Sequence, residues 1–416
     1  MVAALHPETF LFSLAAILVA AKFFGALAQR VGQPAVLGEL LAGVILGGSM
    51  LALLPTTGPL HAIIGLLAEV GVVILLFEIG LETDLREMFR VGPSAATVAA
   101  VGVAAPFLLG FGLWLWWRPD LGDAASGAIT PVAVFIGATL TATSVGITSR
   151  VLADLDRLNS AEARIIMGAA IVDDVLGLVI LAIVSSLAAG AALSVFGIAL
   201  KLGLAIGFLV VAVVLGRWIM PYVFERLDRI DLRGMLVVSA FAFALALAGL
   251  AGIAGSALII GAFAAGLVLS STNQFDFITH RIQPIADIFA PIFFVYVGSS
   301  VDVSLLNPFD SNFDLDVIAV AAALLVVAVA GKVVSGYSVG WRGVRLNHLA
   351  IGVGMVPRGE VGLIFAQLGL DTGIIQQRTF NAVVLVVMLT TFVAPPLLKQ
   401  IFGRRDRLAN EQEGIA

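Results

Sequence analysis

The chain has 416 residues, of which 60% are hydrophobic and only 12% are charged, with a formal net charge of −5. Soluble domains have about 25% charged residues, so this composition excludes a soluble enzyme, a secreted module and a disordered protein. The acidic balance gives no electrostatic reason to expect a nucleic-acid partner, and the absence of cysteine excludes disulfides and thiolate metal sites. The mean hydropathy of +1.08 instead favours a protein embedded in a lipid bilayer.

Apolar segments of about twenty residues follow one another along the chain, and each is long enough to cross a bilayer as a helix. They predict an all-α polytopic membrane protein with 13 transmembrane helices. Strands of an outer-membrane barrel would alternate over about ten residues, so that class is excluded. The segments cover residues 9–28, 34–54, 60–82, 91–117, 127–149, 161–187, 193–220, 233–251, 253–270, 282–301, 315–337, 346–370 and 378–402.

The Lys and Arg residues gather on alternate connections between these segments. With the N-terminus placed outside, seventeen of the 23 cations fall on the inward side, and only Arg118 and Arg378 fall on the outward side. Cytoplasmic loops are rich in Lys and Arg, so the chain is expected to be a multi-pass protein of the cell's inner (plasma) membrane. Its N-terminus is expected outside and its C-terminus in the cytoplasm.

Two segments are poorly suited to an uninterrupted helix. The fifth contains the hydroxyl-rich stretch ATLTATSVG at 138–146, and the twelfth contains GVGMVPRGE at 352–360. Hydroxyls compete for backbone hydrogen bonds and proline removes one, so both segments are predicted to be broken helices that border protein or a polar cavity. The two lie seven spans apart and therefore run in opposite directions, which predicts two inverted six-helix repeats joined by segment seven.

The most informative residues are Asp173 and Asp174, two adjacent acids in the middle of the sixth segment. A charge at that depth costs about 2.5–3.5 kcal/mol on insertion scales, which makes a functional role the default interpretation. The alternative is a pair of protonated acids bonded to neighbours. Adjacent helical residues point about 100° apart, so one aspartate can face a cavity while the other faces a partner helix.

Nearby polar residues complete this candidate site. Thr143, Ser144 and freed carbonyls of the fifth segment can supply oxygen ligands for Na⁺ together with one aspartate; ordinary helix packing is the alternative for the two hydroxyls. Lys332 is the natural partner of the second aspartate, unless it reaches an interface along its own stem. Arg358 and Glu360 lie in the break of segment twelve, where they either replace the charge of a broken helix end or pair with each other.

Other polar residues carry weaker predictions. Glu39, Glu69, Glu78 and Glu82 are interpreted mainly as structural charges or as charges at an entrance to the site. The four histidines are scattered without metal-ligand spacing, and the chain contains no phosphate-binding Walker loop. We therefore expect no catalytic residues, no enzyme activity and no cofactor.

The chain resembles the monovalent cation:proton antiporter superfamily, and within it the two-aspartate branch of NapA- and NhaA-type sodium/proton antiporters. The resemblance spans nearly the whole chain in order, and the aspartate pair with the later lysine is its most specific part. The matching stretches are GQPAVLGELLAG at 32–43, LLFEIGLE at 75–82, TATSVGIT at 141–148, VDD at 172–174, Lys332 and PRGEVGLI at 357–364.

The resemblance implies a homodimer and elevator-like alternating access. It implies dimerisation-domain helices in 1–90 and 231–303, transport-domain helices in 91–190 and 304–403, a linker helix in 191–230 and a short cytoplasmic tail in 404–416. Asp174 would be the main cation ligand and Asp173 would pair with Lys332. An aspartate at position 173, where electroneutral relatives carry Asn or Gln, points to electrogenic exchange.

The expected function is therefore secondary active antiport of Na⁺, and also Li⁺, against H⁺, with both ions competing for the intramembrane aspartates. A K⁺/H⁺ antiporter on the same scaffold is the alternative within the class, because sequence does not give the size of an ion cage. A passive cation channel and a sodium-coupled symporter are alternatives from other classes.

Overall fold

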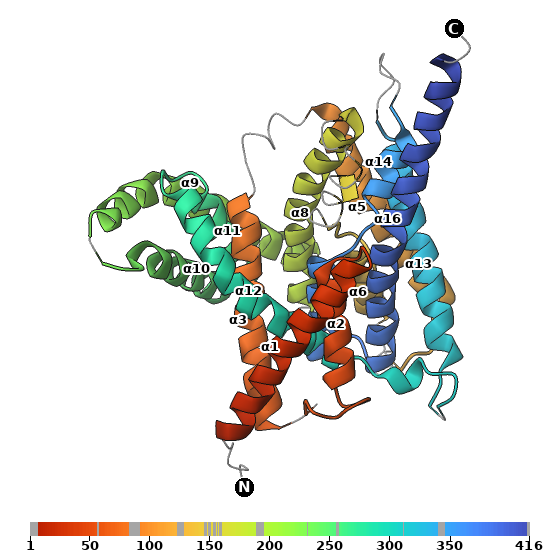
Figure 1. Ribbon diagram of the computed structural model, residues 1–416, viewed down its shortest axis with the longest axis horizontal. Helices are drawn as coiled ribbons and strands as arrows, with labels where there is room; N and C mark the ends of the chain where they lie inside the picture. Colours follow the sequence, from red (N-terminus) through yellow and green to blue (C-terminus); the bar gives the residue numbers. More distant parts are fainter. Residues whose placement is uncertain are drawn as a thin grey trace. The chain divides into compact units, whose positions relative to one another are not determined.

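A computed structural model describes the chain at residues 7–55, 58–82, 92–122, 129–144, 148, 151–152, 155, 157, 160–188, 195–230, 232–254, 258–310, 312–339 and 346–413. Within these residues all regular secondary structure is helical (Figure 1), which confirms the predicted all-α class. The chain divides into two compact units. The first comprises Met1–Leu85 and Leu181–Ser304, and the second comprises Arg86–Ile180 and Leu305–Ala416.

In the described part of the first unit, α3 packs against α11 and α12, α2 packs against α1 and α12, and α10 packs against α11. The helices of this unit are α1 (Pro7–Arg30), α2 (Ala35–Leu46), α3 (Pro59–Glu82), α9 (Val195–Asp228), α10 (Met235–Ile253), α11 (Leu258–Leu269) and α12 (Phe275–Ser299).

Glycines bring the backbones of this first unit into direct contact. A Cβ atom on Gly80 of α3 would collide with the carbonyl oxygen of Phe263, and one on Gly266 of α11 would collide with that of Phe77. Gly43 of α2 and Gly298 of α12 approach each other in the same way. Helices in lipid associate mainly through close van der Waals packing, so these glycines fix the spacing of α2, α3, α11 and α12.

In the second unit, α13 is the central element and packs against α5, α14 and α16, while α6 packs against α5 and α15. The helices are α5 (Pro93–Trp117), α6 (Ile129–Thr139), α8 (Ala161–Ala188), α13 (Leu315–Gly336), α14 (His348–Gly354), α15 (Glu360–Asp371) and α16 (Gln377–Glu413); the residues of α8 from Leu181 onward belong to the first unit. The short 3₁₀ helix η2 (Val303–Leu305) lies where the chain passes from the first unit to the second.

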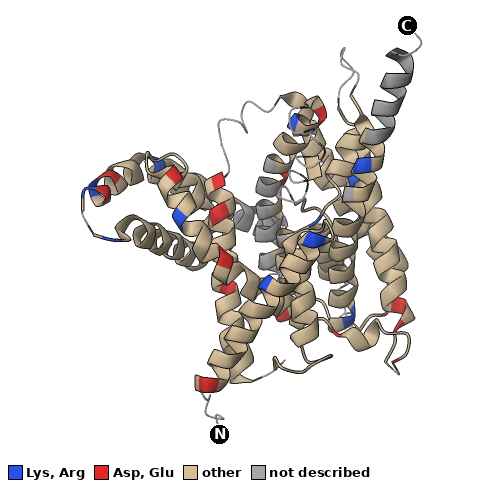
Figure 2. Ribbon diagram, viewed as in Figure 1, with Lys and Arg blue, Asp and Glu red and all other residues tan. Residues whose placement is uncertain are grey.

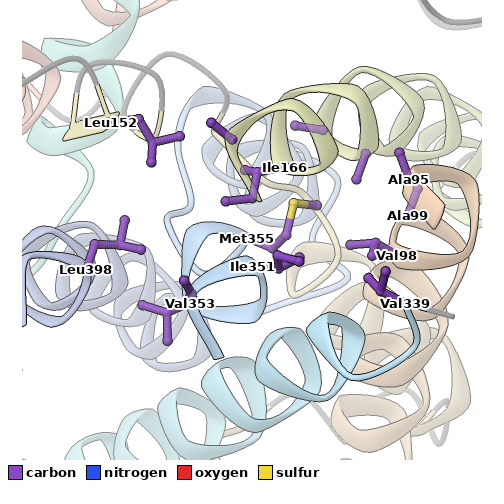
Figure 3. Packing of buried hydrophobic residues seen from close by; sticks show 14 of the residues in the cluster. Ala95, Val98, Ala99, Leu152, Ile166, Val339, Ile351, Val353, Met355 and Leu398 are labelled. Atoms are coloured by element: carbon purple, nitrogen blue, oxygen red, sulfur yellow. The ribbon is translucent and has the colours of Figure 1, made fainter. Parts of the chain in front are cut away.

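An apolar cluster holds the helices of the second unit together beside the break in segment twelve. Met355, Ile351 and Val353 come from that break and from α14, and they meet Ile166 of α8 and Leu398 of α16 (Figure 3). Met355 and Ile351 are completely buried. The start of α5 contributes only small or β-branched side chains to this cluster, so the helices approach closely here.

The described residues include eight helices that are long and apolar enough to cross a membrane, together with four shorter apolar helices of 10–17 residues. Charged residues are sparse along the helices of each unit (Figure 2). The structure therefore agrees with a chain that crosses the membrane several times. The count of 13 spans and the inverted repeat stay predictions.

Helices at three of the predicted segments are shorter than expected. Segment 34–54 is helical only at α2, because the chain becomes extended at Gly47 and folds back so that the N–H groups of Leu53 and Leu54 donate to the carbonyl of Leu46. In segment five the helix α6 stops at Thr139. Segment twelve is interrupted between α14 and α15, which confirms the break predicted from its glycines and proline.

Candidate functional site

Asp173 of α8 and Lys332 of α13 form a buried ion pair. Lys332 Nζ lies 3.2 Å from Asp173 Oδ1 and 3.1 Å from Oδ2, so the ammonium donates to both carboxylate oxygens. Neither side chain has any exposed surface. The desolvation of two charges costs several kcal/mol per ion and is offset only where geometry is good. A Cβ on Gly102 of α5 would lie 3.7 Å from the same Nζ, so α5 forms one wall beside the ammonium.

The polypeptide after α6 runs against the break between α14 and α15. Ser144 N donates to the carbonyl of Pro357 at 2.8 Å. Thr143 Oγ1 donates to Met355 O at 3.3 Å, and Thr148 Oγ1 donates to the carbonyl at the end of α14 at 2.7 Å. The last carbonyls of a helix have no partner within it. The hydroxyls of segment five therefore satisfy the backbone groups that the break in segment twelve exposes.

Arg358 is the largest completely buried side chain among the described residues, and it joins three parts of the second unit. Its Nη1 donates to Ala142 O at 3.1 Å and its Nη2 donates to Ala328 O on α13 at 3.3 Å. Its own carbonyl accepts a hydrogen bond from Thr391 Oγ1 on α16. Because a guanidinium does not lose its proton in proteins, Arg358 places a permanent positive charge beside the two interrupted segments.

The charges of Lys332 and Arg358 act on the same carboxylate. Ala328, whose carbonyl accepts from Arg358, precedes Lys332 by one turn of α13, so both cations lie along one side of this helix. Asp173 interacts electrostatically with the Arg358 guanidinium. Lys332 is thus the direct partner of Asp173, and Arg358 adds a second favourable charge.

The other predicted site residues are placed less completely. Asp174 follows Asp173 on α8 and Glu360 begins α15, but their side chains lie outside the described residues. The pairing of Glu360 with Arg358 therefore stays a prediction. The Na⁺ site made of Asp174, Thr143 and Ser144 also stays a prediction. Thr143 and Ser144 are each 3% exposed. They lie where the chain after α6 packs against the break between α14 and α15, and we call this place the crossing.

Sequence reasoning missed two of the hydroxyls that hold this site. Thr148 bonds the end of α14, and Thr391 bonds the carbonyl of Arg358. Thr391 follows Thr390 within an otherwise apolar segment, and both are buried. A pair of hydroxyls in a spanning segment is a recognisable signal for contact with another helix. The carbonyl acceptors of Ala142 and Ala328 had no such signal.

The acids Glu39, Glu78 and Glu82 lie on α2 and α3 of the first unit. Glu39 is 7% exposed. Lys22 of α1 and Asp287 of α12, which form a surface ion pair at 3.0 Å, both act on it electrostatically. Among the described residues, no group of three or more His, Asp or Glu side chains is arranged to hold a metal ion.

Comparisons with known proteins agree with this architecture. The transmembrane sodium/hydrogen exchanger family model matches residues 15–403. The high-affinity Na⁺/H⁺ antiporter NhaS3 of Synechocystis sp. is 42% identical over 97% of this chain and 92% of its own length. The Na⁺/H⁺–K⁺ antiporter GerN of Bacillus cereus is 34% identical over 96% of this chain and 97% of its own length.

A solved structure shows the same fold. The sodium proton antiporter MjNhaP1 of Methanocaldococcus jannaschii superposes with a TM-score of 0.71 over 94% of this chain and 96% of its own, at 17% identity. The matching family and the curated relatives are multi-pass membrane transporters and not enzymes, as predicted for this chain. The chain belongs to the sodium/hydrogen exchanger family.

Proposed function

We propose that this chain is a secondary active antiporter that exchanges Na⁺, and also Li⁺, for H⁺. The observation that carries the proposal is the completely buried Asp173–Lys332 pair, which lies next to a second acid position on the same helix. An intramembrane acid is costly unless its charge is cancelled. The names of NhaS3 and GerN support Na⁺ and H⁺ as the exchanged ions.

The balance of charge indicates which residue exchanges ions. Asp173 already pairs with Lys332, so its charge is compensated without a transported ion. Asp174 is the neighbouring acid, and we propose that it binds either a proton or Na⁺. Thr143 and Ser144 would add oxygen ligands together with carbonyls freed by the breaks. Either bound ion cancels the charge of Asp174, which would allow the site to change sides of the membrane.

We further propose an electrogenic cycle that moves more H⁺ than Na⁺. Each elementary charge that crosses 100 mV changes the free energy by about 2.3 kcal/mol, so one extra proton lets the membrane potential drive Na⁺ extrusion. Lys332 and Asp173 are the two candidates for carrying that proton.

The two compact units suggest the structural basis of the cycle. We propose that the second unit is the transport domain, because it contains both interrupted segments and the buried ion pair. The first unit would form the dimerisation domain of a homodimer in the inner membrane, with the linker helix at 191–230. Thirteen spans, an inverted repeat, an outside N-terminus and elevator-like movement complete this proposal.

Potassium is the second candidate substrate. GerN is named a Na⁺/H⁺–K⁺ antiporter, and this name favours a test of K⁺ alongside Na⁺ and Li⁺. Family membership supports antiport over the channel and symporter alternatives.

The test uses purified protein in vesicles with an internal pH-sensitive dye and an imposed pH gradient. Addition of Na⁺ or Li⁺ should dissipate the gradient in wild type, and Asp174→Asn should abolish this response while the protein stays folded. Asp173→Asn should leave exchange that no longer responds to an imposed voltage. Asp287→Asn is the matched control, because Asp287 is an exposed acid of the first unit. Normal exchange by Asp174→Asn would refute the proposed site.

A further inference from the structure

Helix α15 carries a polar pair beyond the crossing that the proposed exchange site does not use. Gln367 is only 6% exposed, and its Nε2 donates to Asp371 Oδ1 at 2.7 Å. The other amide atom, Oε1, is buried and accepts no hydrogen bond in the described structure. A buried acceptor without a donor costs about 1–3 kcal/mol, and a bound ligand that contacts Oε1 would remove this cost.

Packing of α15 does not explain the pair. A Cβ on Gly369 would touch Phe135 of α6 and Ile375, and one on Gly362 would touch Val387 of α16. Gly369 is two residues from both Gln367 and Asp371, which is about 200° around the helix. The polar pair therefore lies on the opposite side of α15 from the face that packs on α6 and α16.

Gln367 and Asp371 lie along α15 between the crossing and the end of the second unit where α15 ends. α15 begins directly after the break and ends at Asp371. Gln367 lies seven residues from its start, which is about 10 Å along a helix axis. Beyond Asp371, Arg378 of α16 is bound by Asp314 and Asp316 at the start of α13. This end of the second unit is therefore rich in carboxylates, which raise the local concentration of cations.

We propose that Gln367 Oε1 and the Asp371 carboxylate form a second binding site for a monovalent cation. Ions would bind there as they pass between the outer end of α15 and the crossing. Amide and carboxylate oxygens are the ligands that hard cations prefer, and an ion would supply the partner that Oε1 lacks. The outward direction of this route rests on the orientation given under the proposed function.

Direct detection uses thallium(I) as an electron-dense monovalent probe. Crystals of the full-length protein grown at alkaline pH and soaked in a Tl⁺ salt should show an anomalous peak in contact with Gln367 and Asp371. Crystals of Gln367→Met should lose this peak, because methionine has a similar length but no amide oxygen. A wild-type map with no peak at these residues would overturn the inference.

A sided transport assay tests whether ions pass through the site. The vesicles contain the protein in a known orientation. Na⁺ is added at low concentration on one side or the other, and the rate of Na⁺/H⁺ exchange is divided by the Na⁺ concentration. Gln367→Met should lower this value roughly tenfold on the outer side only, since one lost contact to an ion is worth about a factor of ten. If Gln367→Met fails to fold, Asp371→Asn takes its place in the assay, because Asp371 is at an exposed position. This variant should also lower the value on the outer side.

Gln376→Met is the matched control, because Gln376 is an exposed glutamine in the connection that follows α15; its values should equal those of wild type on both sides. An equal fall on both sides for Gln367→Met, or no change on either, would contradict a site on the outer route. Failure of the wild-type protein to exchange Na⁺ for H⁺ from either side would instead refute the proposed function, and the thallium map tests the second site independently.

Discussion

Removal of the ammonium of Lys332 tests the buried ion pair directly. In Lys332→Met the side chain keeps a similar length but loses its charge, so the Asp173 carboxylate loses the donor that contacts both of its oxygens. Because both side chains are completely buried in wild type, water does not replace the lost donor. The variant should therefore be less stable than wild type.

The magnitude follows from the surroundings of Asp173. Breaking a buried pair from one side costs about 3–5 kcal/mol. Arg358 still acts on Asp173, so we expect the lower end, about 3 kcal/mol. The second change Asp173→Asn removes the stranded charge and should recover most of the loss, so the losses of the two single variants should not add in a double-mutant cycle.

Thermal unfolding in detergent, followed for the two single variants, the double variant and wild type, measures this cycle. Stability of Lys332→Met equal to that of wild type would refute the view that this ion pair stabilises the fold.

Four further substitutions test other contacts within the second unit. Gly331→Ala should lower the melting temperature strongly, because its Cβ would lie 2.8 Å from the backbone of the proline in α5, whereas Gly102→Ala should be tolerated because its nearest contacts are 3.5–3.7 Å; equal melting temperatures would contradict this contrast. Thr148→Val should cost about 1–3 kcal/mol in unfolding experiments, because it leaves a buried carbonyl of α14 without its donor; a neutral result would indicate that another group takes over. Asp314→Asn should cost at most about 1 kcal/mol, because its partner Arg378 is one-third exposed; a much larger loss of stability in the same assay would show that this end of the unit is structurally essential.

The sequence predicted those features that have a strong side-chain signal. The glycines and the proline of segment twelve indicated its break, and the structure confirms it between Gly354 and Glu360. Lys332 was expected as the partner of an aspartate, and it lies against Asp173. Both predictions rest on residues that are costly in an apolar helix, and this cost is visible without coordinates.

Features that depend on backbone acceptors could not be predicted. The pairing of Arg358 with Glu360 stays a prediction, but nothing in the sequence indicated that Arg358 also donates to the carbonyls of Ala142 and Ala328, because alanine gives no polar signal. Hydropathy also overestimated the length of helices such as α2, because the residues after Gly47 stay apolar while the chain folds back. A hydropathy profile reports which residues avoid water but not the course of the backbone.

The glycine contacts of the first unit have a mechanical consequence. Where Gly80 meets α11 and Gly298 meets α2, main-chain atoms touch main-chain atoms, so these contacts contain no side-chain torsions through which they could yield. Elsewhere in proteins, rotamer changes absorb small displacements of one helix against another. At these glycine contacts, one helix cannot shift unless its partner helix moves with it. A bilayer that thins or thickens around the first unit would therefore tilt α2, α3, α11 and α12 together.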